Sequence, residues 1–210
     1  MSPLLVVVLL ALLLGIQPVT TDVYLPALPA LQADLRAPMA EVQLTFAALL
    51  LAFGTSQLVW GPLSDRFGRR PILLAGMALY VLASIACVLA PSMPALVWAR
   101  VAQGAAIGAA VMCARAIVRD LYPPLEGARM MSRGLSGLGV IAVVCAPLGG
   151  LLTDWLHWRA AMSALVVFGA GTLVLLALRF RETIPARNPD ALAPGMLWRR
   201  WRQIAANPTF

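Results

Sequence analysis

The stretch GPLSDRFGRRP, residues 61–71, decides the fold of this chain. It is a short charged segment between two long apolar runs, residues 42–60 and 72–90, and neither run contains a charged residue. Each run is long enough to cross a bilayer as a helix, because a spanning helix needs about 20 residues at about 1.5 Å per residue. The stretch therefore predicts a turn at the membrane surface between two spanning helices.

The composition of the whole chain agrees with a membrane protein. Of its 210 residues, 61% are hydrophobic and 12% are charged, which is about half the charge of a soluble domain. So much apolar surface needs lipid as its solvent. The net charge of +7 does not indicate a nucleic-acid partner, because the basic residues lie between apolar runs. The cysteines, Cys87, Cys113 and Cys145, lie far apart inside such runs, which favours small hydrophobes over a metal site.

Six apolar runs follow one another along the chain. They predict spanning helices at residues 3–31, 42–62, 71–90, 94–118, 131–152 and 158–180. The expected fold class is therefore an all-α membrane protein with six transmembrane helices in residues 1–180. The polar segment 181–210 follows, and within it residues 197–206 predict a short basic amphipathic helix with Trp198 and Trp201 at the membrane interface.

The arginines gather on one side of this predicted topology. Loops 65–70 and 119–130, the adjoining helix ends and the segment after residue 180 are rich in arginine, whereas the opposite side carries only Arg36 and Arg159. Because loops rich in Lys and Arg stay in the cytoplasm, both termini are predicted to be cytoplasmic.

Asp22 is the leading candidate for a functional residue. An ionisable side chain inside the bilayer is costly, so it usually faces a cavity or a partner. There it can take up and release protons. Pro26 and Pro29 each remove a backbone donor, which loosens the helix just beyond the acid. The alternative interpretation is that Asp22 caps a helix that restarts near the outer surface.

Arg100 is the expected counterpart of Asp22. Arginine stays protonated even when buried, so Arg100 could interact with an acid such as Asp22 or hold a carbonyl-bearing substrate. Gln103, three residues on, shares its helical face. The alternative is an interfacial arginine that extends outward to the membrane surface.

Residues of the charged stretch have separable physical roles. Gly61 and Gly68 permit tight turns and close helix approach. Asp65 can accept hydrogen bonds from free N–H groups at a helix N-terminus. The three arginines of the stretch can each donate paired hydrogen bonds to carboxylates or lipid phosphates. These arginines are Arg66, Arg69 and Arg70.

Glycines also pattern two later spans. Gly104 and Gly108 form a G-x-x-x-G spacing, which lets helices approach closely. The fifth span carries several glycines together with Pro147, Gly149 and Gly150. A packing face with a proline kink accounts for these residues without any function.

The stretch at residues 61–71 closely resembles the signature loop of the major facilitator superfamily of secondary transporters, which lies between helices 2 and 3 of that family. R-x-x-Q-G at residues 100–104 resembles a fourth-helix motif of its proton-coupled members. TDVYLPALP at 21–29, ARAIVRDLYP at 114–123 and Glu182-Thr183 resemble the bicyclomycin-resistance and chloramphenicol/florfenicol-resistance (Bcr/CflA) drug exporters. The fifth span resembles the antiporter motif ending G-P-x-x-G-G, from which it departs at Ala146.

This resemblance implies the N-terminal half of a drug:proton antiporter, built as a 3+3 inverted repeat. Residues 1–180 would be the six-helix bundle and 181–210 the start of a cytoplasmic linker, with the second half absent. The implied proton-coupling and substrate residues are Asp22, Tyr24, Arg100 and Gln103. The 61–71 loop would latch onto the second half, with Asp65 and Arg69 in that role. No cofactor is implied, and the implied energy source is the proton gradient.

The implied activity is export of small amphipathic drugs by alternating access in a bacterial inner membrane. The implied partners are the drug, protons, the lipid bilayer, and the missing half or a second copy. Two other functions stay open, a permease of the same fold for another metabolite and a half-length protein that only binds or regulates a partner. A membrane-embedded enzyme is disfavoured, because the chain has no H-E-x-x-H or G-x-S-x-G motif.

Overall fold

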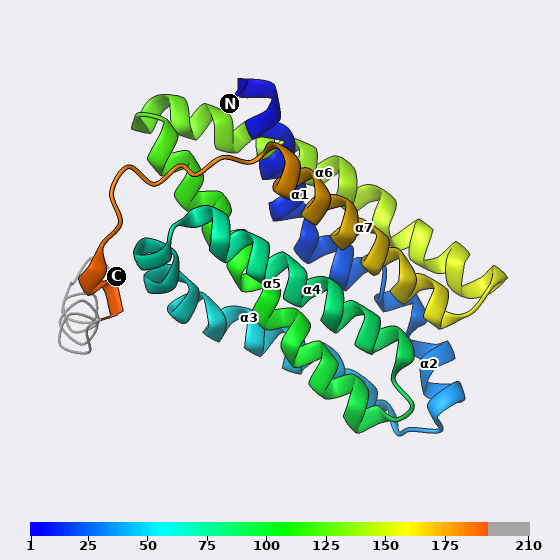
Figure 1. Ribbon diagram of the computed structural model, residues 1–210. Helices are drawn as coiled ribbons and strands as arrows, with labels where there is room; N and C mark the ends of the chain where they lie inside the picture. The colour runs from blue at the N-terminus through cyan, green and yellow to red at the C-terminus, as the bar shows by residue number, and fades with distance from the viewer. Residues whose placement is uncertain (193–210) are drawn as a thin grey trace, which may run out of the picture.

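The computed structural model describes residues 1–192, so the amphipathic helix predicted at 197–206 lies outside the described residues. The helices are α1 (Pro3–Asp22), α2 (Leu28–Leu35), α3 (Met39–Phe67), α4 (Arg69–Leu89), α5 (Met93–Leu121), α6 (Pro124–Trp155) and α7 (Trp158–Arg179), with short 3₁₀ turns η1 (Leu25–Ala27) and η2 (Pro189–Leu192). Figure 1 shows the long helices running side by side as one bundle.

The predicted fold class is confirmed. Counting α1, η1 and α2 together, the described chain has 6 segments long and apolar enough to cross a membrane. All six predicted spans fall on these segments, because a long apolar run satisfies its backbone polar groups in lipid by forming a helix.

The turn predicted at residues 61–71 is much shorter than expected. Helix α3 continues to Phe67 and α4 begins at Arg69, so only Gly68 interrupts the helical backbone. Gly68 has a φ of 105°, which a residue without a Cβ adopts at little cost. Pro62 is accommodated inside α3. The loop predicted at 119–130 shortens in the same way, since α5 ends at Leu121 and α6 begins at Pro124.

The first span is broken just after Asp22, as its prolines predicted. Helix α1 ends at Asp22, the turn η1 contains Pro26, and α2 begins at Leu28 with Pro29 in its first turn. The break places Asp22 at a helix end inside the spanning segment. The regular α-helical hydrogen bonding is therefore interrupted beside the acid.

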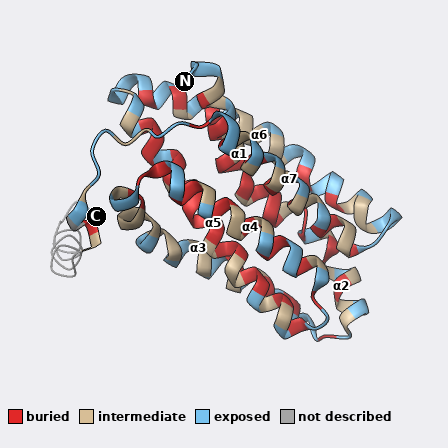
Figure 2. Ribbon diagram, in the orientation of Figure 1, coloured by how far each residue is buried: buried red, intermediate tan, exposed pale blue. Residues whose placement is uncertain are grey.

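Small residues let the helices pack closely. A Cβ added to Gly104 of α5 would overlap the carbonyl oxygen of Leu49 on α3, and one added to Gly108 would lie 3.2 Å from the carbonyl oxygen of Phe53. The packing interpretation of the G-x-x-x-G spacing is thus confirmed. Buried residues run along α1 and α5, whereas few residues of α3 and α6 are buried (Figure 2).

The bundle has two distinct ends. We call the end with Gly68, the N-terminus of α6 and the C-terminus of α7 the basic end, and the end with α2 the opposite end. At the opposite end, the Asp34 carboxylate accepts hydrogen bonds from Trp158 Nε1 at 2.9 Å and Arg159 Nη1 at 2.8 Å. These bonds fasten α2 to the start of α7.

Candidate functional site

Arg100 lies inside the bundle, with 0% of its surface exposed. Its guanidinium carbon sits 3.6 Å from the centre of the Tyr24 ring. Its Nη1 donates to Gln103 Oε1 at 2.7 Å, and its Nη2 donates to Met162 Sδ at 3.6 Å. The alternative of an arginine extending to the membrane surface is therefore wrong.

A chain of buried hydrogen bonds continues from Gln103 across three helices. Its Nε2 donates to Ser84 Oγ at 2.7 Å, and that hydroxyl donates to the Tyr80 carbonyl oxygen at 2.7 Å. The Tyr80 hydroxyl in turn shares a 2.7 Å hydrogen bond with Thr20 Oγ1 of α1. Arg100 is thus linked through Gln103 and Ser84 to the backbone of Tyr80 on α4, and the side chain of Tyr80 reaches on to α1.

Tyr24 connects this network to α3. Its hydroxyl shares a hydrogen bond with Thr45 Oγ1, and Thr45 also donates to the Val42 carbonyl oxygen at 2.6 Å. Tyr24 is 1% exposed, so its ring fills the space over Arg100 and excludes solvent. Sequence reasoning placed Tyr24, Arg100 and Gln103 together by resemblance, and the structure brings them into contact.

Asp22 is not part of this cluster. Its Oδ1 accepts a 2.7 Å hydrogen bond from Thr21 Oγ1, and within residues 1–192 no ion pair joins it to Arg100. The expected Asp22–Arg100 contact is therefore not formed in this structure. The physical reason is the helix break, since Tyr24, two residues beyond the acid, occupies the space over the guanidinium.

Arg100 is consequently a buried cation whose described partners are all neutral. Its Nε has no hydrogen-bond partner among the described residues. Burying a charge without a counterion costs free energy, and the Tyr24 ring offsets only part of that cost. The site is therefore electrostatically receptive to an incoming carboxylate or carbonyl oxygen.

The fifth-span motif packs against the segment that carries Asp22. A Cβ added to Gly149 of α6 would overlap the Val23 carbonyl oxygen, and one added to Gly150 would lie 3.9 Å from Pro26 Cβ. Pro147 lies inside α6. The motif thus lets α6 lie directly on the helix break, which agrees with the packing interpretation.

Arg69 joins three helices at the basic end. It is 2% exposed, and its Nη1 donates to Asp65 Oδ1 at 2.7 Å and also to Ser64 Oγ. Its Nε donates to Asp120 Oδ2 of α5 at 2.9 Å. The ion pairs tie the ends of α3, α4 and α5 together.

The other loop residues lie around this junction. Arg70 Nη2 donates to the Ala177 carbonyl oxygen of α7 at 3.1 Å. Arg66 is exposed beside Phe67, with its guanidinium carbon 5.5 Å from the ring centre. Gly61 lies on α3 facing α5, where an added Cβ would be 4.0 Å from Met112 Cε.

Asp65 does not accept from the free N–H groups of α4, contrary to the sequence-based expectation. Glu182 does so, because its carboxylate accepts from the backbone N–H of Arg69 at 2.9 Å and of Arg70 at 3.1 Å. It also accepts from the N–H groups of the two residues after it. Burial raises the pKa of the Glu182 carboxyl, but these donors outweigh that effect and hold the pKa below its ordinary value.

The segment after α7 therefore crosses the α3–α4 junction. A Cβ on Gly68 would overlap the Glu182 carboxylate, so the glycine makes room for it. Further on, the Asn188 N–H donates to the Asp65 carbonyl oxygen at 2.9 Å. Figure 1 shows this segment leaving α7 and crossing to the end of α3.

Six membrane-length helices and a buried polar core between them define half of a membrane transporter bundle. Residues 10–210 match the family model of the Major Facilitator Superfamily. The chain belongs to this superfamily of transporters, which are not enzymes.

Comparison with known proteins shows that the chain matches about half the length of such transporters. Over 181 residues the chain is 35% identical to multidrug resistance protein D of Escherichia coli, covering 86% of this chain and 46% of the relative. It is 36% identical over 161 residues to a chloramphenicol resistance protein of Pseudomonas aeruginosa, covering 76% of this chain and 38% of the relative. The chain thus spans about half the length of these relatives.

Two solved structures share the fold. The proton:xylose symporter XylE aligns with a TM-score of 0.76 and 16% identity, over 86% of this chain and 45% of that one. The human organic anion transporter MFSD10 aligns with a TM-score of 0.70 and 23% identity, over 98% of this chain and 57% of that one.

Proposed function

We propose that this chain is the N-terminal half of a proton-coupled multidrug exporter of the bacterial inner membrane. The names of two bacterial relatives, a multidrug resistance protein and a chloramphenicol resistance protein, support drug export. In this proposal residues 1–180 form the bundle, residues 181–210 begin the linker, and both termini are cytoplasmic. The partner is the second six-helix half, or a second copy of the chain.

The observation that carries the proposal is the buried Arg100, which has no counterion among residues 1–192, beside a helix break that bears Asp22. Two unlike charges attract strongly in a medium of low dielectric constant. An ionised Asp22 is drawn toward Arg100, and a protonated Asp22 is not. Protonation thus selects between two arrangements of residues 22–27, and a ligand that prefers one of them shifts the balance.

The proposed cycle follows from this choice. Proton uptake by Asp22 from the outside releases the drug outward, and proton loss to the cytoplasm resets the carrier. Tyr24 and Gln103 hold the guanidinium while Asp22 is away. At the basic end, the Asp65–Arg69 pair is the rigid edge that meets the second half when the cytoplasmic gate closes.

Asp22→Asn tests the proposal. We would co-express the 210-residue chain with the C-terminal half of the E. coli multidrug resistance protein D and measure chloramphenicol efflux driven by an imposed pH gradient. We expect loss of gradient-driven efflux at unchanged membrane content. Asp154→Asn, which neutralises an exposed acid on α6, is the matched control and keeps efflux.

The outcomes separate the alternatives. Efflux that survives Asp22→Asn removes Asp22 from the coupling step. Gradient-driven uptake or release of a sugar or organic acid, with no response to drugs, would favour a permease for another metabolite. If the paired halves assemble but move no substrate, the non-transporting, partner-binding function is favoured.

A further inference from the structure

The hydroxyl group of Thr21 lies between the carboxyl group of Asp22 and the backbone of its own helix. Its Oγ1 is 2.7 Å from Asp22 Oδ1, 3.1 Å from the Gln17 carbonyl oxygen and 3.4 Å from the Pro18 carbonyl oxygen. A hydroxyl has one proton to donate and two lone pairs that accept, so it donates fully to only one of these oxygens at a time. Thr21 is 4% exposed, so its hydrogen-bond partners come from the protein rather than from bulk water.

The preceding residue, Thr20, has no such choice. Its Oγ1 donates to the Ile16 carbonyl oxygen at 2.6 Å, so the 2.7 Å hydrogen bond that it shares with Tyr80 must be donated by the tyrosine hydroxyl. The two adjacent threonines of α1 therefore differ. Thr20 holds one fixed arrangement, whereas the Thr21 hydroxyl can point to Asp22 or to Gln17.

The choice at Thr21 matches the two protonation states of Asp22. An ionised carboxylate only accepts hydrogen bonds, so Thr21 donates to it. A carboxyl group protonated on Oδ1 donates to Thr21 Oγ1, and the threonine proton then turns to the Gln17 carbonyl oxygen. Both arrangements use the same positions of the oxygen atoms, so Asp22 can gain a proton before residues 22–27 move.

Two titratable side chains approach this pair from the neighbouring helices. Cys145 of α6 is close enough to interact electrostatically with Asp22, but a protonated thiol carries no charge. Arg100 of α5 is covered by the Tyr24 ring. In the arrangement seen here, the hydroxyl of Thr21 is therefore the group that meets the Asp22 carboxyl directly.

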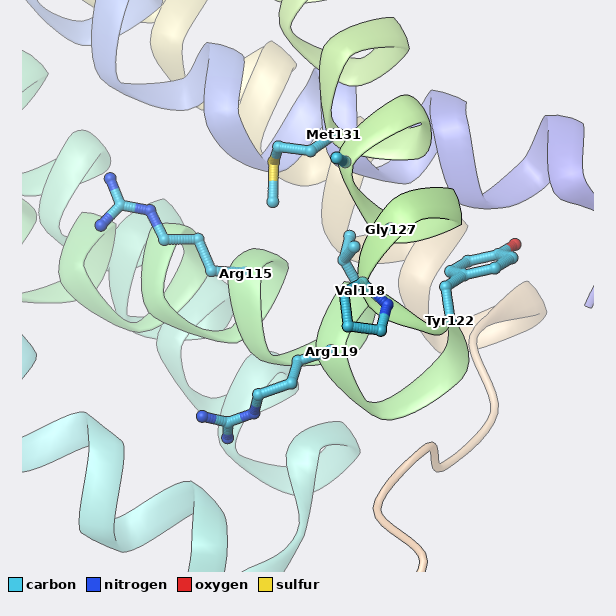
Figure 3. A pocket seen from close by; sticks show the side chains of 8 residues that line it. Arg115, Val118, Arg119, Tyr122, Gly127 and Met131 are labelled. Carbon is cyan, nitrogen blue, oxygen red and sulfur yellow. The ribbon is translucent and has the colours of Figure 1, made fainter.

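The other arginines of α5 and α7 lie away from Asp22. Arg115 and Arg119 border a hollow between α5 and α6 at the basic end, and Figure 3 shows their guanidinium groups extending apart from one another. The Asp22 end of α1 instead packs beside Gly149, much further along α6. Helix α7 carries its charged residues only in its first and last turns, at Arg159 and Arg179.

We propose that Thr21 is a positioning residue for proton coupling, whose hydroxyl donates to ionised Asp22 and accepts from protonated Asp22. In the ionised state this charge-assisted hydrogen bond opposes the attraction of Asp22 toward Arg100. In the protonated state that attraction is absent, and the hydroxyl still holds the carboxyl group at the end of α1. The role in transport rests on the function proposed above, whereas the reversal of the hydrogen bond is a property of the isolated chain.

The hydrogen bond is tested on the purified 210-residue chain in lipid nanodiscs, by infrared difference spectra between acidic and neutral pH. The C=O stretch of protonated Asp22 is the band that Asp22→Asn removes. Thr21→Val keeps the shape of the side chain but takes away the acceptor, so we expect this band to move to higher frequency. Thr21→Ser restores the hydroxyl and should return the band to its original position.

The matched control is Thr172→Val on α7. Thr172 is also buried, at 2% exposed, and donates to a carbonyl oxygen of its own helix, that of Phe168, at 2.9 Å. Its loss should leave the Asp22 band in place. An unmoved band in Thr21→Val, or an equal shift in Thr172→Val, would overturn the proposal. So would the absence of any band that depends on Asp22, because the acid would then not become protonated.

The role in coupling is tested in the paired halves used above. Thr21→Val should slow gradient-driven efflux about tenfold, the effect expected from losing one charge-assisted hydrogen bond, and Thr21→Ser should restore it. Full efflux by Thr21→Val would remove Thr21 from the coupling step. Failure of the proposed function gives a different result, because efflux would then survive Asp22→Asn while the infrared band still responded to Thr21→Val.

Discussion

The contact between α3 and α5 gives a sharp prediction, because it depends on the missing side chain of Gly104. A Cβ there would overlap the Leu49 carbonyl oxygen and lie only 3.0 Å from its carbonyl carbon. That carbonyl is held within the helical hydrogen-bond ladder and cannot rotate away. Gly104→Ala must therefore push the helices apart by about 1 Å to restore an ordinary C···O contact of about 3.3 Å.

The expected cost follows from this displacement. Overpacking of a close contact costs about 1–3 kcal/mol. Separation also lengthens the neighbouring hydrogen bond from Trp60 Nε1 to the Ala105 carbonyl oxygen, now 2.7 Å. For a chain of this size, a loss of about 2 kcal/mol lowers the melting temperature by roughly 4–8 °C. Gly54→Ala is the control, because an added Cβ on Gly54 meets nothing within 4 Å.

The assay is thermal unfolding of the purified variants in one detergent, followed by size-exclusion chromatography of heated samples. Gly54→Ala should melt at or slightly above the temperature of the unmodified chain, because alanine favours the helix by about 1 kcal/mol over glycine. Equal melting temperatures for the Gly104 and Gly54 variants would refute the close α3–α5 contact.

Three further predictions concern the polar clusters. The depressed pKa of Glu182 means that its stabilisation is complete above its ordinary value of 4.5 and is lost as pH falls below it. Glu182→Gln should remove this acid sensitivity from the amide exchange protection at residues 69–70, and unchanged sensitivity would contradict the capping contact. Gln103→Leu removes the acceptor of Arg100 Nη1 and the donor to Ser84 Oγ and should cost about 1.5–3 kcal/mol in unfolding free energy. Gln103→Glu supplies a counterion and should melt above the leucine variant, whereas the reverse order would argue against an unneutralised guanidinium. Asp34→Ala should speed backbone hydrogen exchange in residues 28–35 but not in α5. Unchanged exchange in residues 28–35 would show that the Asp34 hydrogen bonds to Trp158 and Arg159 are not needed to hold α2 in place.

The spans were predictable because their signal is local. Residues 42–60 and 72–90 carry no charge over the length of a bilayer, and few other structures satisfy such a run. The helix break after Asp22 was predictable from Pro26 and Pro29 for the same reason. The extent of the 61–71 turn was not, because sequence alone did not reveal that Gly68 would suffice to reverse the chain.

The contacts that the sequence did not predict join residues far apart in the chain or involve uncharged side chains. Glu182 reaches Arg69 across 113 residues, and nothing near either residue in sequence marks the pairing. Tyr80 and Ser84 are neutral residues in an apolar run, so no charged residue in that run indicates that they bond to the Arg100 cluster. Their four-residue spacing on one helical face was the signal available.

The three-way junction at Arg69 has a mechanical consequence. The basic ends of α3, α4 and α5 cannot slide past one another without pulling a buried guanidinium from two carboxylates, and breaking a buried ion pair is costly. These three helices therefore move as one stiff block. The helix break at residues 23–27 lies outside this block, so a change in the angle between α1 and α2 would leave the block's shape unaltered.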